Sequence, residues 1–306
     1  MQTHKVLILG GSGFVGRHVC ERLNQLGIKM TVLTRRGPAK SVKYLPYVDV
    51  VQGNPHDPKV LKQALKGHTA VINLVAVLHG SENDFERVHE RLPSSLANIC
   101  AELSIKRLIH ISALGADQSA PSMYLRSKAR GEQTLHSIAK TKGLDITLLR
   151  PSVIFGEDDE FINLFAKLQK HFPFVPLAGA DAKFQPVWVV DVAHAIAHCL
   201  LNPHTTNQTF ELGGTGIFSL RELVKFAGIW SNHRRPIFGL PPFTAYLQAL
   251  VMEHLPGPTL MSRDNLLSMR VDNVLSGKLP GLSALDVKEP QSIFGVFGVN
   301  ESDMQA

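Results

Sequence analysis

A glycine-rich turn directly follows an apolar segment near the start of the chain, in the sequence KVLILGGSGFVGRH at residues 5–18. The apolar residues of 5–9 predict a buried strand, and the amphipathic pattern of 14–26 predicts a helix. Glycine between a strand and a helix lets the backbone turn with positive φ and approach a bound phosphate closely. Because unpaired N–H groups at a helix N-terminus attract an anion, this stretch predicts a dinucleotide-binding unit.

Two glycine patterns overlap in this turn. One is G-x-G-x-x-G on Gly11, Gly13 and Gly16, and the other is G-x-x-G-x-x-G beginning at Gly10. We favour the second pattern, because Gly10 follows the strand at once and stands where the chain must reverse. Gly13 then approaches the diphosphate, and Gly16 lets the helix pack on the strand. The residues expected to contact the cofactor here are Gly10, Gly13, Phe14, Val15 and Gly16.

Short apolar segments alternate with helical patterns through the first half of the chain. Strands are expected at 5–9, 29–34, 48–51, 70–75, 107–112 and 145–150, and helices at 14–26, 58–66, 84–103 and 124–142. Strands that are apolar throughout, alternating with amphipathic helices, indicate a parallel sheet covered on both faces. The predicted fold is therefore α/β, with a doubly wound parallel Rossmann sheet.

The alternation loosens after Arg150 and Pro151. We predict an NAD(P)-binding Rossmann domain at 1–155 and a smaller, mostly helical lobe for a substrate or partner at 156–306. The elements expected beyond 155 are a helix at 160–171, a strand at 185–190, a helix at 191–201 and a strand at 208–212. We expect the segment 185–212 to return to the sheet.

Composition excludes several classes of function. The formal net charge of +6 favours anionic partners, but the basic residues are dispersed and no nucleic-acid-binding module is visible. No apolar run reaches the ~18 residues of a membrane span, and the apolar run at residues 5–9 is too short for the core of a secretion signal. We expect a cytoplasmic protein, with peripheral contact to the inner face of the membrane left open. Cys20, Cys100 and Cys199 lie far apart in apolar contexts, which predicts buried thiols in a reducing compartment.

The end of the second predicted strand bears on the identity of the cofactor. An NAD-binding site places Asp or Glu there, about 20 residues after the glycines. This chain instead has Thr34, Arg35 and Arg36, and no acidic residue before Asp49. Guanidinium groups match a 2′-phosphate in charge and in paired donors, so the pattern favours NADP(H) over NAD(H). Solvated loop arginines remain the alternative interpretation.

Three residues could carry chemistry at a carbonyl or hydroxyl group. Tyr124 and Lys128 lie four residues apart at the start of a predicted helix, hence on one face. Ser112 ends the strand RLIHIS, at the edge where ligands bind in such sheets. We expect Tyr124 to transfer a proton and Ser112 to hold the substrate oxygen. Lys128 would lower the pKa of Tyr124 and hold the nicotinamide ribose.

Several further segments resemble one known family. They are the glycine loop at 10–16, GNPHD at 53–57, IHISALGA at 109–116, YLRSKARGE at 124–132, LLRPSVIFG at 148–156 and PVWVVDVAHAIA at 186–197. Together they resemble the short-chain dehydrogenase/reductases in their extended or atypical branch. The segment 255–274 resembles the group that contains the NADPH-binding accessory subunit of mitochondrial complex I and its bacterial relatives.

The resemblance implies positions for further site residues. It places Asn54 and Asp57 near the adenine, and Pro151 and Ser152 near the nicotinamide. It also implies that a chain of this group can bind NADPH firmly without established turnover. One departure weakens the catalytic interpretation: His89 stands where many extended members carry an asparagine at a helix start.

Two other patterns have structural interpretations. Asp191, His194 and His198 share one helix face, but Asp191 is better explained as an N-cap, and we predict no metal site. The apolar stripe of the helix at 243–252, which includes Phe243, is expected to form the core of the lobe. A membrane or partner face remains its alternative.

Three functions remain open on this sequence. The first is an NADP(H)-dependent oxidoreductase acting on a carbonyl/hydroxyl pair, with a quinone-related substrate among the options. The second is a non-catalytic NADPH-binding accessory or sensor protein of a respiratory or membrane-associated assembly. A sugar-nucleotide epimerase or dehydratase is the least favoured, because the C-terminal lobe shows no evident diphosphate clamp.

Overall fold

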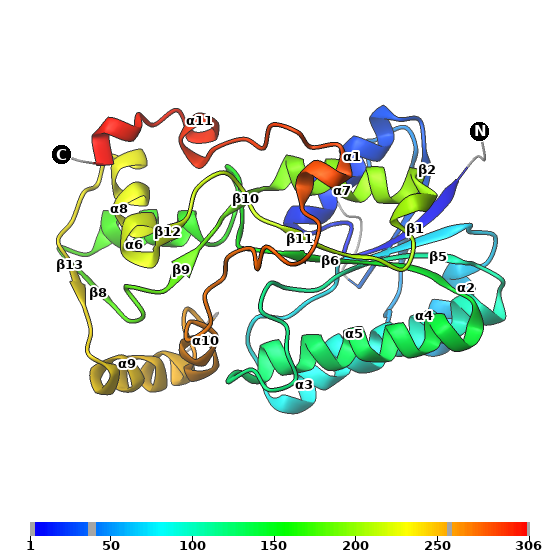
Figure 1. Ribbon diagram of the computed structural model, residues 1–306, viewed down its shortest axis with the longest axis horizontal. Helices are drawn as coiled ribbons and strands as arrows, with labels where there is room; N and C mark the ends of the chain where they lie inside the picture. Colours follow the sequence, from blue (N-terminus) through cyan, green and yellow to red (C-terminus); the bar gives the residue numbers. More distant parts are fainter. Residues whose placement is uncertain (1–3, 36–40, 256–258, 305–306) are drawn as a thin grey trace.

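Seven parallel strands form one sheet in the computed structural model, which describes residues 4–35, 41–255 and 259–304 (Figure 1). The strands lie in the order β11-β6-β5-β4-β1-β2-β3. Their bounds are Lys5–Leu9 (β1), Lys29–Thr34 (β2), Val48–Gln52 (β3), Ala70–Asn73 (β4), Arg107–Ile111 (β5), Asp145–Pro151 (β6) and Thr209–Leu212 (β11). The strand order reverses between β1 and β4, as in a doubly wound sheet, so the predicted Rossmann fold is confirmed.

Helices cover both faces of the sheet. On one face lie α1 (Phe14–Gln25) and α7 (Val189–Leu201), and on the other lie α2 (Pro58–Leu65), α4 (Leu92–Glu102) and α5 (Met123–Lys142) (Figure 1). β1 shows why its sequence is apolar throughout. Val6 and Ile8 belong to the core beneath α1 and α7, whereas Leu7 and Leu9 belong to the core beneath the other three helices. The three cysteines are free and buried in these two cores, as predicted.

The helix expected at 84–103 is divided into three parts. A short helix α3 (Glu82–Glu86) and a π-helical turn η1 (Arg87–Arg91) precede α4. η1 lies very close to α5. The approach is so close that a Cβ atom at Gly131 of α5 would collide with the backbone carbonyl oxygen of His89. This π-helical turn, a kind often found near functional sites, therefore lies against the helix that carries Tyr124.

The remainder of the chain forms a lobe with a core of its own. Its helices are α6 (Ile162–His171), α8 (Leu220–Trp230), α9 (Pro242–His254), α10 (Arg263–Ser268) and α11 (Ile293–Phe297), and its 3₁₀ turn is η4 (Glu301–Met304). Two further 3₁₀ turns, η2 (Pro203–Thr205) and η3 (Leu282–Leu285), lie beside α7 and the main sheet. Its strand pairs are β7 (Ile154–Phe155) with β10 (Val187–Trp188), β8 (Val175–Leu177) with β13 (Ile237–Gly239), and β9 (Lys183–Phe184) with β12 (Phe218–Ser219). Aromatic side chains fill the core between α8 and α11, where Trp230 and Phe297 have ring centroids 4.7 Å apart.

Two predictions in this region are wrong. The strand expected at 185–190 is only the two-residue β10, which pairs with β7 outside the main sheet. Helix α7 begins at Val189, so Asp191 is not its N-cap; the Asp191 carboxylate instead accepts a hydrogen bond from the backbone N–H of Gln291 at 2.9 Å. β11 does join the main sheet beside β6. The division of the chain at residue 155 stays a prediction.

α9 also differs from the expectation that its apolar stripe forms the lobe core. Only Ala245 and Ala249 of this helix are buried, whereas the side chain of Phe243 is 79% exposed. The helix packs through these two small residues, whereas Phe243, Leu247 and Val251 are at least half exposed. Within the described part of the chain, no helix has the length and apolar character needed to cross a bilayer.

The C-terminal segment returns from the lobe to the sheet (Figure 1). Ser152, just after β6, donates a hydrogen bond from Oγ to Oδ1 of Asn273 at 2.6 Å. Further along, the backbone N–H of Glu211 donates to the carbonyl oxygen of Pro280 at 3.0 Å, and η3 packs against α7. The lobe is therefore joined to the sheet at its β6–β11 edge.

Candidate active site

The glycine loop has the conformation expected for the second pattern, on Gly10, Gly13 and Gly16. Gly10 has φ of +82°, which a side chain would strain. A Cβ atom at Gly16 would collide with the Gly10 carbonyl oxygen, so this glycine lets α1 pack on the loop. Gly11 is also constrained, because its Cβ would lie 2.8 Å from the side chain of Val32. Gly10, Gly11 and Gly16 are therefore required by the protein's own packing or backbone.

Gly13 has a different environment. A Cβ atom there would meet only the carbonyl oxygen of Gly10 among the described residues, at 3.4 Å, and its φ of −81° suits any residue. Gly13 is also the N-cap of α1, and no described side chain caps this helix. The N–H groups at the start of α1 are therefore available to an anion, and Gly13 leaves space beside them that the fold itself does not use. This arrangement fits a diphosphate group.

Phe14 and Val15 begin α1 beside this loop. Phe14 lies against the lobe, because its ring would be 3.2 Å from a Cβ atom at Gly156. Val15 is partly buried and packs on the core beneath α1. Phe14 therefore links the glycine loop to the lobe, and Val15 links it to the core beneath α1.

The predicted adenosine-side residues lie at the carboxyl ends of β2 and β3. Thr34 is buried at the end of β2, and Arg35 is exposed directly after it, whereas Arg36 lies outside the described residues. The backbone N–H of Gly53 donates to the carbonyl oxygen of Thr34 at 2.8 Å, which joins the two strand ends.

Asn54 and Asp57 shape the turn that follows β3. The Asn54 side chain accepts a hydrogen bond from the backbone N–H of His56 at 3.1 Å, and Asp57 caps α2 by accepting from the Lys59 N–H at 2.8 Å. Both residues are exposed on the same sheet edge as Arg35. The turn bond of Asn54 and the helix cap of Asp57 explain why these residue types occur here even without a ligand.

Lys128 joins the start of α5 to the end of β5. Its ammonium group is buried, with the residue 1% exposed, and donates to the Ile111 carbonyl oxygen at 3.1 Å. The same nitrogen lies 5.9 Å from the centroid of the Tyr124 ring. Ser112 follows Ile111 directly, so the structure brings the elements carrying Ser112, Tyr124 and Lys128 together at the carboxyl edge of the sheet.

Ser112 differs from its neighbours in its hydrogen bonding. Its Oγ atom is buried and has no hydrogen-bond partner among the described residues, although its backbone N–H continues the ladder to Leu149 at 2.7 Å. A buried hydroxyl without a partner is uncommon, because its desolvation is then uncompensated. At the end of a strand in this fold, such a hydroxyl fits the role of a ligand-binding group.

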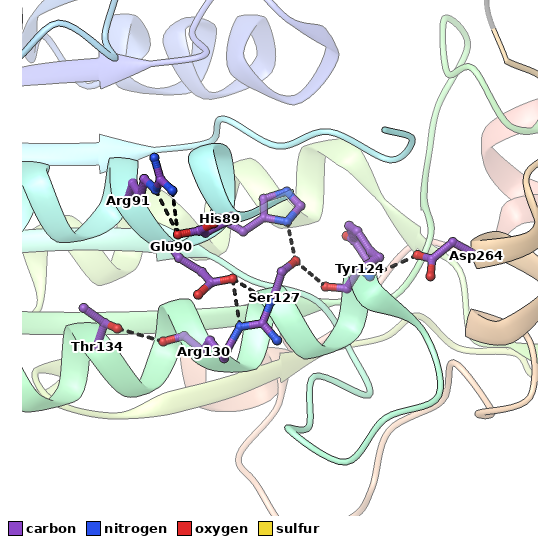
Figure 2. A network of polar contacts seen from close by, with 9 residues as sticks. His89, Glu90, Arg91, Tyr124, Ser127, Arg130, Thr134 and Asp264 are labelled. Carbon is purple, nitrogen blue, oxygen red and sulfur yellow. Dashed lines mark hydrogen bonds and ion pairs between the residues drawn. The ribbon is translucent and has the colours of Figure 1, made fainter. Parts of the chain in front are cut away.

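A carboxylate from the lobe caps the helix that carries Tyr124 (Figure 2). Asp264 of α10 accepts hydrogen bonds from the backbone N–H groups of Met123 at 2.6 Å and of Tyr124 at 3.0 Å. Asp264 is 7% exposed, so this contact is shielded from water. Sequence reasoning missed it, because the two segments are 140 residues apart and an acidic residue in a short helix has no distinctive pattern.

Comparison with known proteins defines the family. Residues 6–213 match the NAD dependent epimerase/dehydratase family. The chain belongs to this family. Members of the family bind a nicotinamide dinucleotide, in agreement with the glycine loop described above.

Two similar proteins belong to the groups that the sequence resemblance indicated. The chain is 29% identical over 290 residues to the rat protein named NADH dehydrogenase (ubiquinone) 1 alpha subcomplex subunit 9, mitochondrial, and the match covers 92% of this chain and 75% of the rat protein. It is 30% identical to the ceramide reductase of Caulobacter vibrioides, over 63% of this chain and 60% of that one. The resemblance to extended short-chain dehydrogenase/reductases near the complex I subunit is confirmed.

Solved structures support the fold. The UDP-glucose 4-epimerase of Thermus thermophilus, solved in complex with NAD, superposes with a TM-score of 0.72 over 99% of both chains, at 18% identity. At this identity the likeness concerns the fold alone.

The pKa values of the Tyr124 pair differ from the prediction. We expected Lys128 to lower the pKa of Tyr124, but burial raises it to about 12. Burial also lowers the pKa of Lys128 to about 8, against an opposing effect of the nearby Glu132 carboxylate. Desolvation therefore outweighs the attraction between ammonium and phenolate, and Tyr124 is a neutral phenol at neutral pH.

His89, the residue that the sequence resemblance places at a usual asparagine position, is 1% exposed and lies beside Ser127 (Figure 2). Its Nε2 accepts a hydrogen bond from the Val77 backbone N–H at 3.2 Å, so in the neutral ring the proton lies on Nδ1. Nδ1 lies 2.8 Å from Ser127 Oγ, which in turn donates to the Tyr124 carbonyl oxygen at 2.8 Å. Burial is the main cause that lowers the pKa of His89 to about 2, with smaller effects of Lys128 and His110.

A second buried histidine lies beneath the same edge. The Asn73 amide donates to Nδ1 of His110 at 3.0 Å, which joins β4 to β5. Burial and the charge of Lys128 lower the pKa of His110 to about 3. Both histidines are therefore neutral, and Lys128 supplies positive charge to this part of the site.

Pro151 and Ser152 lie at the end of β6, next to β5 and on the same sheet edge. The Pro151 carbonyl oxygen accepts a hydrogen bond from the Leu114 N–H at 3.0 Å, so it fixes the loop after Ser112. Ser152 Oγ is engaged with Asn273 and is a structural group here. Over the described residues, no three His, Cys, Asp or Glu side chains are arranged to hold a metal ion.

Replacing Gly13 and Gly16 in turn separates ligand binding from packing. We expect Gly16→Ala to lower the free energy of unfolding by about 1–3 kcal/mol, because its Cβ meets backbone atoms that cannot move aside. Gly13→Ala keeps the free energy of unfolding within about 1 kcal/mol of wild type but weakens NADPH binding by about tenfold or more, because the added methyl takes the space of a diphosphate. Denaturant unfolding and a fluorescence titration measure the two effects. Unchanged NADPH affinity in Gly13→Ala would contradict this site.

His89 and His110 predict a specific acid sensitivity. Because the pKa of each is well below 6.5 in the folded chain, the unfolded chain binds more protons below pH 6.5. Stability is therefore complete above that pH and falls by up to about 1.4 kcal/mol per pH unit for each histidine as the pH decreases. In His89→Asn the slope between pH 6 and pH 4 should be smaller by about this amount. His136→Asn, at an exposed position on α5, is the control and should keep the wild-type slope.

Proposed function

We propose that this chain is an NADP(H)-dependent oxidoreductase that acts on a carbonyl or hydroxyl group, with residues 1–155 holding the dinucleotide and 156–306 the substrate. The observation that carries the proposal is the buried Ser112 hydroxyl, which has no partner among the described residues, beside the Lys128 contact to the end of β5. A substrate oxygen would supply the missing hydrogen-bond partner, and Tyr124 starts the helix that Lys128 holds in place.

Each of the three side chains has a role that follows from its state. Tyr124, with a pKa of about 12, keeps its proton at neutral pH and can donate it to the oxygen of a carbonyl being reduced. Ser112 donates a hydrogen bond to the same oxygen and so favours the developing negative charge. Lys128, with a pKa of about 8, is mostly protonated at neutral pH and offers a cation for the ribose hydroxyls and the phenol.

The dinucleotide would be held by the uncapped start of α1 and by the ends of β2 and β3. The nicotinamide ring supplies or accepts the hydride when it is bound. Arg35, followed by Arg36 in the sequence, supports NADP(H), because a guanidinium group matches the 2′-phosphate. In addition, β2 does not end in an acidic residue that could accept a hydrogen bond from the ribose 2′-hydroxyl of NAD(H). Asn54 and Asp57 lie on the edge that would face the adenine.

The likeness to the two named relatives supports two different versions of this function. The similarity to a protein named ceramide reductase favours turnover on an apolar carbonyl compound, a class that includes quinones. The longer match to a subunit of NADH dehydrogenase favours the second candidate, a dinucleotide-binding accessory protein of a respiratory assembly. Sugar-nucleotide epimerisation fits the family name but has no further support from the lobe.

The Tyr124→Phe variant tests catalysis. We expect NADPH oxidation by the best substrate in a panel of apolar ketones and quinones to fall by roughly 10²–10⁴-fold, with NADPH affinity retained. Tyr44→Phe, at a side chain that is 78% exposed, is the matched control. Equal rates in the Tyr124→Phe variant and wild type would exclude Tyr124 as the acid. A wild-type chain that binds NADPH but oxidises it with no member of the panel would favour the accessory role.

The Arg35→Ser variant tests the choice of cofactor. Loss of a guanidinium that contacts the 2′-phosphate should raise the dissociation constant of NADPH by about tenfold or more and leave that of NADH unchanged. Lys29→Ser removes a charge from the opposite end of the same strand and should change neither constant. Both constants can be measured by nicotinamide fluorescence. An equal effect of Arg35→Ser on the two cofactors would overturn the NADP(H) preference.

A further inference from the structure

A surface cavity of about 280 Å³ lies in the C-terminal lobe, away from the sheet edge described above. α6, α8 and β13 surround it, at the end of the molecule remote from α1 (Figure 1). Four of its six lining residues are cationic: Arg221, Lys225, Arg234 and Arg235. The other two are Gln169 and Ile237, so no acidic side chain of the described residues lines the cavity.

Backbone carbonyl groups fix the positions of three of these cations. Arg221 Nη1 donates to the Ile237 carbonyl oxygen at 3.0 Å, Arg235 Nε to that of Gln169 at 3.0 Å, and Lys225 Nζ to that of Met304 at 2.6 Å. Neutral acceptors orient a cation without cancelling its charge. These side chains are therefore oriented before any ligand arrives.

The charges of this cluster are not balanced by carboxylates. Among the described residues, none of the four cations belongs to an ion pair, whereas seven cationic side chains elsewhere, Arg17 and Arg150 among them, have a carboxylate partner. The adjacent Glu222 is engaged in capping α8, where it accepts from the N–H of Ser219 at 2.7 Å. A concave site with four like charges and no counter-ion from the described residues favours an anionic ligand over a merely solvated face.

We propose that this basic cavity binds a phosphate group. The planar forks of its three arginines match phosphate oxygens in charge and in paired donors, and Lys225 adds a fourth positive group. The cavity volume suits a group of this size rather than a whole dinucleotide. It lies apart from the glycine loop and the ends of β2 and β3, so this site is independent of the proposed function.

The surroundings of the cavity favour a lipid as the carrier of that phosphate. Phe238, next to Ile237, is 57% exposed, and its ring centroid is 6.0 Å from that of Phe174, which is 50% exposed. α9, whose outward face is apolar, packs beside the same strand pair, with Gln248 donating to the Pro176 carbonyl oxygen at 3.0 Å. Exposed aromatic and aliphatic side chains beside basic groups are typical of surfaces that lie at a bilayer interface. A free phosphate compound is the other carrier.

Two binding assays on the full chain distinguish the carriers. In the first, the protein is sedimented with vesicles of phosphatidylcholine alone and of phosphatidylcholine mixed with phosphatidic acid. In the second, binding of inorganic phosphate and of glycerol 3-phosphate is followed by calorimetry. We expect sedimentation only with the acidic vesicles, and less of it as salt is added.

The variants are Arg234→Glu and the pair Arg234→Ser with Arg235→Ser. The Arg234 side chain makes no hydrogen bond or ion pair within the described part of the chain, so its charge reversal should leave folding intact; thermal unfolding checks this. We expect binding to fall by about tenfold or more in either variant. Lys66→Ser with Lys106→Ser removes two exposed charges from the other end of the molecule and should retain binding.

Each outcome decides the proposal. Loss of acidic-vesicle binding in the Arg234 variants, but not in the lysine control, supports a lipid phosphate. Binding of the soluble phosphates alone, with the same dependence on Arg234, supports the cavity and assigns it to a free phosphate compound. Absence of both kinds of binding in wild type, or equal losses in the variants and the control, overturns the proposal.

Discussion

The buried ammonium group of Lys128 connects the sheet, the central helix and the candidate chemistry. It donates to the last carbonyl oxygen of β5 and so holds α5 against the edge of the sheet. It also adds positive charge that helps keep His89 and His110 neutral, although burial is the larger cause for both. A cation enclosed at this point therefore ties the helix to the strand and adds to the effect of burial on the groups nearby. The burial that lowers the pKa of Lys128 leaves it close to the physiological range.

The parts of the fold that sequence predicted well are those governed by local chemistry. The strand–glycine–helix unit at the start of the chain is correct because the positive φ of Gly10 and the close approach of Gly16 to the Gly10 carbonyl oxygen are constraints that act within a few residues. The alternation of buried strands and amphipathic helices is equally local, and it was sufficient to predict the doubly wound sheet. Ser112 could be placed at the ligand-binding edge because parallel strands end at a common edge, and Lys128 because it lies one turn from Tyr124 at the start of the helix that follows.

The parts that failed depend on contacts between distant segments. The strand expected at 185–190 has an apolar pattern that suits a buried helix start as well, and its pairing with β7 decided the outcome. The stripe on α9 has the spacing of a core face, but the structure buries the small residues Ala245 and Ala249 and leaves Phe243 exposed. The pKa of Tyr124 moved opposite to the prediction because burial, which is not visible in sequence, exceeded the effect of one charge. Arg234 and Arg235 were adjacent in sequence, yet only the fold brings Arg221 and Lys225 to the same cavity.

The capping of α5 by Asp264 has a consequence for how such chains can diverge. The lobe provides a backbone-binding carboxylate to a helix that covers the Rossmann sheet, so this contact is one of the joints between lobe and sheet, beside that of Ser152 with Asn273. A chimera that exchanges the lobe for that of a relative would have to retain a short polar acceptor at this point, even if all residues near the nucleotide were untouched. The residue at position 264 of the lobe is thus restricted by the N-terminus of α5, which lies outside the lobe.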